Sequence, residues 1–204
     1  MRNEQIKKIA FAGIIIGLII VMSFTPFGFI TIASGASITL VHIPVLIGAM
    51  VLDKKYGAVL GLVFGVCSII LAFMNVATNA PFTNPIVSIL PRVAFGFLIV
   101  PLYNLLNKKI NNNIVATAIT MCLATFIHTI IVLVPMYIVW RTNFYFGVND
   151  YTANYGDGTG INLFALIFGI LLANGLIEIL LAGVIGTPIS MAMKVIIKQN
   201  KIEE

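Results

Sequence analysis

The sequence predicts an all-α integral membrane protein, one domain over residues 1–204, with six transmembrane helices and both termini cytoplasmic. Composition is the first reason: 60% of the residues are hydrophobic and 9% are charged, whereas a soluble domain carries about 25% charged residues. Length is the second reason, because a membrane-spanning helix needs about 20 apolar residues and six of them fill the chain. The third reason is that basic residues gather at alternate helix ends, which sets the orientation.

Hydropathy and helix-breaking residues place the six predicted helices along the chain. The first helix ends before Pro26, and Pro44 is expected to kink the second, which is short for a full span. A turn rich in Asn and Pro, NVATNAPFTNP, separates the third helix from the fourth. The predicted ranges are about 6–23, 38–52, 56–74, 86–106, 113–140 and 161–195.

The basic residues lie on one side of the predicted membrane. Lysine pairs at 54–55 and 108–109 join the second helix to the third and the fourth to the fifth. With three basic residues before the first helix and three closing the chain, ten of the twelve lie on this side. Cytoplasmic loops are enriched in Lys and Arg, so this side is predicted to be cytoplasmic. The same lysines explain the net charge of +5, and no nucleic-acid partner is predicted.

The loops predicted on the outer side are longer than the cytoplasmic turns. They cover about 24–37, 75–85 and 141–160 and are rich in Gly, Asn, Thr and aromatic residues. Long loops in compact proteins are usually functional or disordered, and an uncharged, aromatic composition is not typical of disorder. We therefore interpret the outer side as a ligand-binding face.

Arg92 is a charged residue inside a predicted membrane helix. It lies about six residues into the fourth helix, roughly 9 Å from its outer end, and directly follows Pro91. A charge at this depth costs several kcal/mol unless it is paired or solvated. Two interpretations are open: the guanidinium binds an anionic group of a ligand from outside, or it pairs with Glu178 of the sixth helix.

Other polar residues within the predicted helices are also candidates for substrate binding. Asn174 and Glu178 are four residues apart and share one helix face, so they either contact the substrate or form hydrogen bonds between helices. A Glu178 buried without a partner would be neutral. His42 and His128 lie in apolar surroundings, where each is either a packing residue or a ligand contact.

Two asparagines of the Asn- and Pro-rich turn, Asn79 and Asn84, are predicted to supply hydrogen bonds at the outer mouth of the binding site. Together with Arg92, His42, His128, Asn174 and Glu178, they complete the set of predicted substrate-binding residues.

Glycines recur at helical spacing in two of the predicted helices. Gly57, Gly61 and Gly65 form one ridge on the third helix, and Gly13 and Gly17 form another on the first. Small residues four apart let helices approach closely in a membrane. The first ridge predicts packing within the chain, and the second faces either this chain or another membrane subunit.

Motifs of catalysis and of cofactor binding are absent from the sequence. There is no GxxxxGK[ST] phosphate loop and no HExxH or GxSxG motif, and the two cysteines lack metal-ligand spacing. The sequence therefore predicts no enzyme activity, no catalytic residue, no cofactor and no metal site.

Three stretches resemble the substrate-binding S components of energy-coupling factor (ECF) transporters, which take up vitamins in bacteria. They are SITLVHIPVLIGAMVLDKKYGAVLGLVFG, NPIVSILPRVAFGF and NGLIEILLAGVIGTPI. The strings around His42, Arg92 and Glu178 look most like the pantothenate group; S components for hydroxymethylpyrimidine, pyridoxine and riboflavin are related alternatives. The chain departs from the family at Asp53–Lys55, where a small turn is common, and at Ile14, which follows Ala10 at the spacing where a second small residue is common.

The resemblance implies a function and a set of partners. An S component binds its vitamin at the outer face of the bacterial cell membrane, beneath the first and third outer loops. It then joins a membrane coupling subunit and two cytoplasmic ATPases, and topples in the bilayer to release the vitamin inside. The alternative from another class is a stand-alone channel or proton-coupled carrier that uses Glu178 and His128.

Overall fold

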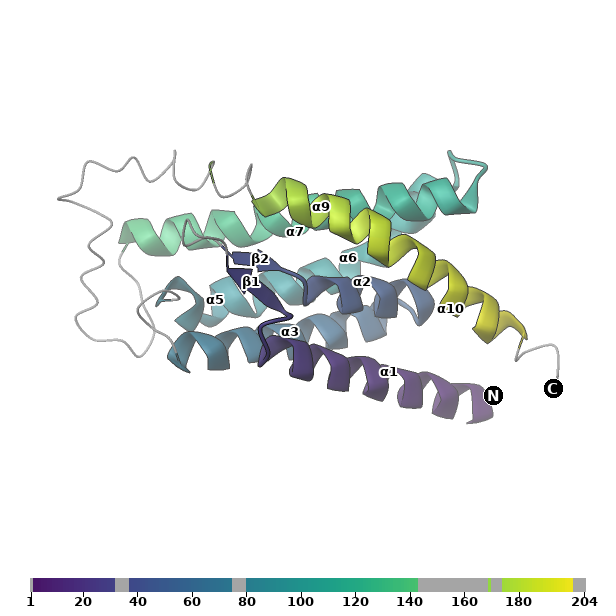
Figure 1. The fold of residues 1–204 in the computed structure, drawn as a ribbon, viewed down its shortest axis with the longest axis horizontal. Helices are drawn as coiled ribbons and strands as arrows, with labels where there is room; N and C mark the ends of the chain where they lie inside the picture. Colours follow the sequence, from purple (N-terminus) through teal and green to yellow (C-terminus); the bar gives the residue numbers. More distant parts are fainter. Residues whose placement is uncertain (1, 32–36, 75–79, 143–168, 170–173, 200–204) are drawn as a thin grey trace.

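A computed structural model describes residues 2–31, 37–74, 80–142, 169 and 174–199. The protein is an elongated bundle of helices with one small β-hairpin beside it (Figure 1). Its elements are α1 (Arg2–Ser23), β1 (Phe29–Thr31), β2 (Ser37–Thr39), α2 (His42–Val51), α3 (Lys54–Met74), η1 (Ala80–Thr83), α5 (Pro85–Ser88), α6 (Leu90–Asn107), α7 (Asn113–Thr142), α9 (Leu176–Leu181), η3 (Ala182–Gly186) and α10 (Thr187–Gln199).

Five described helical segments are long and apolar enough to cross a membrane. Large apolar side chains cover their outer surfaces, including Ile14, Leu180 and Val184, which are each at least 66% exposed. The segments are Gln5–Ser23, Lys54–Met74, Pro85–Asn107, Asn113–Val139 and Leu176–Ile196. The predicted start of the sixth helix, near residue 161, lies outside the described residues.

The second predicted helix, about 38–52, differs from the structure at its start. Residues 37–39 form β2, which pairs with β1 in an antiparallel hairpin that places Phe29 opposite Thr39. The helix α2 begins only at His42 and has 10 residues, so at 1.5 Å per residue it extends about half the 30 Å hydrocarbon core. Hydropathy alone does not distinguish a strand from a helix in a short apolar run, so the predicted helix began too early.

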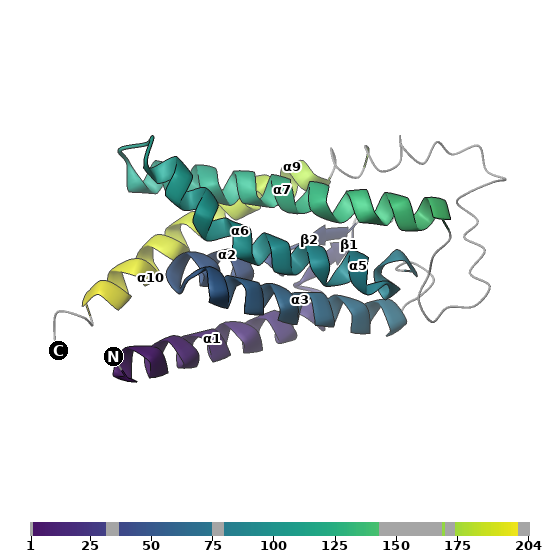
Figure 2. The ribbon, with the colours of Figure 1, turned by 180° about the vertical axis from the view of Figure 1, so that it is seen from behind.

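α2 lies at the centre of the bundle. Every residue from His42 to Met50 is buried, as expected for a helix that is apolar all round. The main core forms where α1, α3, α6, α7 and η3 pack around it, and includes Ile19, Leu46 and Phe64. Figure 2 shows α3 and α6 side by side along the back of the bundle.

Glycines on α3 allow its backbone to come into direct contact with the backbone of α6. A Cβ atom on Gly57 would meet the carbonyl of Gly96, and one on Gly61 would meet the carbonyl of Arg92. One on Gly65 would lie 2.9 Å from the Ser88 carbonyl oxygen. The glycine ridge on the third helix therefore packs within the chain, as predicted.

Candidate ligand-binding site

Arg92 lies in the first turn of α6. The preceding Pro91 leaves a backbone carbonyl free for the Arg92 side chain. Proline has no N–H group, so it cannot donate to the carbonyl four residues earlier, which is that of Val87. The Arg92 guanidinium donates a hydrogen bond to this carbonyl through Nη1. The predicted helix 86–106 is accordingly divided near Ile89 into α5 and α6.

Arg92 is buried in the bundle, with 5% of its surface exposed. The guanidinium carbon lies 5.5 Å from the centre of the Phe64 ring and 5.1 Å from that of Phe82. Ring faces attract a cation. Nε has no hydrogen-bond partner, and among the described residues no carboxylate is close enough to pair with Arg92. The site thus holds a buried cation with donors left over for an anion.

Two histidines from different helices stack on each other close to Phe64, the ring that also flanks Arg92. His42 is the first residue of α2 and His128 lies in α7, and their ring centres are 5.8 Å apart with planes inclined by 21°. The Phe95 ring lies 4.5 Å from that of His128, and the Phe64 ring 6.0 Å. Phe64 therefore contacts both Arg92 and His128. We call Arg92, His42, His128, Phe64 and Phe95 the Arg–His cluster.

Both imidazole rings are buried, and the ring nitrogens of His128 have no hydrogen-bond partner among the described residues. A neutral imidazole has one donor and one acceptor, and a buried polar group left unpaired is costly. The Arg–His cluster therefore offers a cation together with two buried imidazoles, a set suited to a ligand with an anionic end and further polar groups.

The structure brings together three of the seven predicted site residues, Arg92, His42 and His128, from α6, α2 and α7. The aromatic rings around them were missed in the sequence, because phenylalanines in apolar helices are common core residues. Phe95 carried a weak signal, since it is three residues after Arg92 and shares its helix face.

The two predicted asparagines have different outcomes. Asn84 is buried and caps α5, with its Oδ1 atom accepting the Ile86 N–H at 3.0 Å. Such a cap satisfies a backbone donor that the first turn of a helix leaves free. Asn79 lies outside the described residues.

Asn174 and Glu178 are both buried, so the face they share points into the bundle. Glu178 Oε1 accepts a hydrogen bond from the Thr39 N–H at 2.6 Å. Within the described part of the chain Glu178 does not pair with Arg92, which removes the ion pair that was one interpretation of Arg92.

Two surface hollows lie away from the Arg–His cluster. One of about 390 Å³ between α7 and α9 is wholly apolar, and one of about 450 Å³ lies near Asn84, Pro135 and Thr142. In the described residues no group of three or more His, Cys, Asp or Glu side chains is placed to hold a metal ion. Neither hollow is lined by a residue of the Arg–His cluster.

Comparison with known proteins identifies the family. Residues 7–190 match the model of the ECF transporter, substrate-specific component. The chain belongs to this family of S components. The resemblance noted in the sequence is thereby confirmed, and this S component is a multi-pass membrane protein and the substrate-binding part of a transporter rather than an enzyme. Membership implies a vitamin substrate and partners in an ECF module.

A curated relative extends over nearly the whole chain. The S component is 23% identical to the pantothenic acid transporter PanT of Lactococcus lactis subsp. cremoris (strain MG1363). The matched region of 209 residues covers 95% of this chain and 96% of the relative.

Proposed function

We propose that this S component captures pantothenate from outside the cell for ATP-driven uptake by partner subunits. The observation that carries the proposal is Arg92, a buried guanidinium with no carboxylate partner in the described residues. Pantothenate has one carboxylate, whereas riboflavin has none. A guanidinium forms strong, charge-assisted hydrogen bonds with a carboxylate, and the distant relative named as a pantothenic acid transporter supports the same ligand.

The two histidines suit the rest of this ligand. Pantothenate carries hydroxyl and amide groups away from its carboxylate, and these pair with the donor and acceptor of a neutral imidazole. Phe64 and Phe95 supply the apolar walls that are typical of small-molecule sites. In this proposal Arg92 sets the anion preference, while His42 and His128 bind the polar groups.

Binding titrations on purified protein test the ligand. We expect saturable binding of pantothenate, and none of comparable strength for riboflavin, pyridoxine, hydroxymethylpyrimidine or thiamine. Pantothenol, in which a hydroxymethyl group replaces the carboxylate, is the matched control and should bind at least about tenfold more weakly. Tight binding of a neutral vitamin without binding of pantothenate would contradict the proposed ligand and leave the family unaffected.

The proposed topology has six crossings and cytoplasmic termini. The start of α1, the α2–α3 and α6–α7 turns and the end of α10 lie at one end of the bundle (Figure 1, Figure 2). These places carry the basic clusters, including 54–55 and 108–109, which favours a cytoplasmic end. The hairpin and α2 together make the short crossing, with the hairpin toward the outside.

The proposed partners are a membrane coupling subunit and two cytoplasmic ATPases. The sequence has no phosphate loop of its own, so ATP hydrolysis would come from other chains. Transport into liposomes by this chain alone, driven by a proton gradient, would contradict the proposal and favour a stand-alone carrier.

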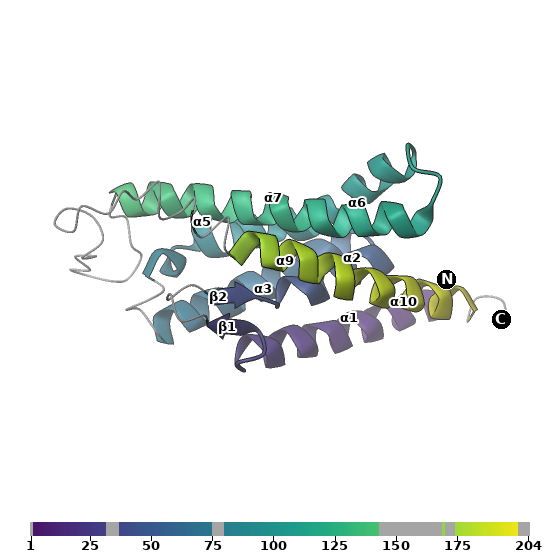
Figure 3. The same cartoon turned by 45° about the horizontal axis from the view of Figure 1, so that its top comes forward.

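α1 is the proposed docking helix for the coupling subunit. It runs along one edge of the bundle (Figure 3), and Gly13, Ile14 and Gly17 are exposed on its outer face. A Cβ atom on either glycine would meet nothing within 4 Å of it in this chain. The small residues therefore leave room for another helix to approach.

Replacing both Gly13 and Gly17 with leucine is expected to reduce co-purification with the coupling subunit and to slow vitamin uptake. Pantothenate binding to the isolated protein should be unchanged, because neither glycine contacts this chain's interior. Val184→Leu, at a position that is 71% exposed on η3, is the matched control. Normal assembly of the double variant would assign docking to another face.

A further inference from the structure

A hydrogen bond joins α9 to the hairpin near the start of the chain. Glu178, which is 7% exposed, accepts the Thr39 N–H through Oε1 at 2.6 Å, across a separation of 139 residues. The contact lies where α9 meets β2 (Figure 1).

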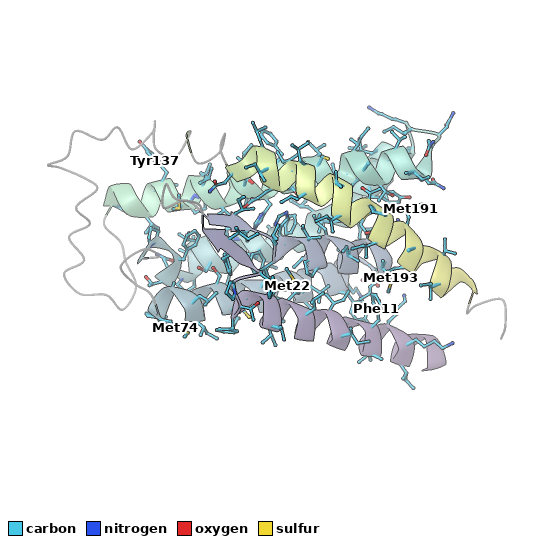
Figure 4. The ribbon with its side chains drawn as sticks, viewed as in Figure 1. Phe11, Met22, Met74, Tyr137, Met191 and Met193 are labelled. Atoms are coloured by element: carbon cyan, nitrogen blue, oxygen red, sulfur yellow. The ribbon has the colours of Figure 1, made fainter. Side chains whose placement is uncertain are left out.

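The strand that contains Thr39, β2, is also held by hydrogen bonds to the residues around β1. It pairs with Phe29 in the hairpin, and the next residue, Leu40, donates its N–H to the Gly28 carbonyl at 2.8 Å. Gly28 has no room for a side chain, because a Cβ atom there would meet the Met22 carbonyl. Figure 4 labels Met22 at this junction, close to the hairpin. The hairpin is thus held between the end of α1 and Glu178.

The path from Thr39 to the Arg–His cluster is short. Leu40 accepts the Ile43 N–H at 3.0 Å in the turn that starts α2. His42, in the same turn, is completely buried and stacks on His128. If β2 shifted relative to α9, the turn that starts α2 would move with it, and the His42 ring would change its position relative to His128.

We infer that Glu178 is a positioning residue: by holding the Thr39 N–H it fixes β2 and thereby places His42 against His128 in the ligand site. This gives Glu178 a role distinct from direct substrate contact or proton transfer. Its effect on affinity rests on the proposed function of the Arg–His cluster, whereas its effect on the placement of β2 does not.

Hydrogen–deuterium exchange of the ligand-free protein tests the placement. Glu178→Ala is expected to raise the exchange rate of the Thr39 amide at least about tenfold, because this amide loses its acceptor. The Leu40 amide keeps the Gly28 carbonyl as its acceptor, and it should also exchange faster because β2 is no longer held. Glu178→Gln keeps an oxygen acceptor and should exchange as the wild type does. Leu180→Ala, at a position 66% exposed on the same helix, is the control for a disturbed α9. Unchanged exchange in Glu178→Ala would overturn the inference.

Pantothenate affinity tests the consequence for the site. We expect at least about tenfold weaker binding for Glu178→Ala, and binding within about threefold of wild type for Glu178→Gln. Equal losses in the two variants would indicate a need for the charged carboxylate and overturn the positioning role, as would faster exchange with unchanged affinity. If the wild type binds no pantothenate, the proposed function fails, while the exchange result still decides whether Glu178 places β2.

Discussion

Replacing Arg92 with alanine is expected to weaken pantothenate binding at least about tenfold, equivalent to about 1.4 kcal/mol. The change removes the buried cation, while the Phe64 and Phe82 rings that flank it remain. Arg92→Lys keeps a positive charge but loses the planar, two-pronged donor set, so its affinity should lie between those of the wild type and the alanine variant. Isothermal titration measures the affinities.

Pantothenol separates a direct contact from a general disturbance of the site. If Arg92 binds the carboxylate, Arg92→Ala should weaken pantothenate binding strongly and pantothenol binding little. Such a difference is the coupling between two groups that a double-variant cycle isolates. A melting temperature close to that of the wild type is the control for folding. Normal pantothenate binding, or an equal loss for both ligands, would make Arg92 a structural residue.

The long helices were predictable because membrane helices have a strong and simple signal. The predicted third helix ended at Met74, as α3 does, and the fifth began at Asn113, as α7 does. The predicted boundaries were wrong where hydropathy gives a weaker signal. Hydropathy does not separate a short apolar strand such as β2 from a helix, and the division between α5 and α6 is a local effect of Pro91 on the Val87 carbonyl.

The candidate site was predictable as single residues but not as a cluster. Arg92, His42 and His128 were conspicuous because polar groups are rare in apolar helices. Their proximity depends on how α2, α6 and α7 pack together, and this packing cannot be deduced from one sequence. Glu178 was conspicuous for the same reason, but its partner is a backbone N–H on Thr39. Backbone partners have no sequence signal, because every residue except proline has an N–H.

Gly61→Ala is expected to destabilise the protein and also to weaken ligand binding. The new Cβ atom would run into the carbonyl of Arg92, which is backbone and cannot rotate away. Overpacking of this kind costs about 1–3 kcal/mol, because α3 and α6 must separate. Since the displaced carbonyl belongs to Arg92 itself, the guanidinium should shift relative to Phe64, and pantothenate affinity should fall even in the fraction that remains folded.

Gly13→Ala is the matched control, because it makes the same substitution in α1 where a Cβ atom meets nothing within 4 Å. It should leave affinity unchanged and stabilise the helix by up to about 1 kcal/mol, since alanine is the better helix former. Thermal unfolding and pantothenate titration of both variants separate the two effects. A Gly61→Ala protein with the stability and affinity of the wild type would show that α6 can yield without moving Arg92. A loss of stability alone would show that the glycine ridge holds the bundle together but does not set the geometry of the ligand site.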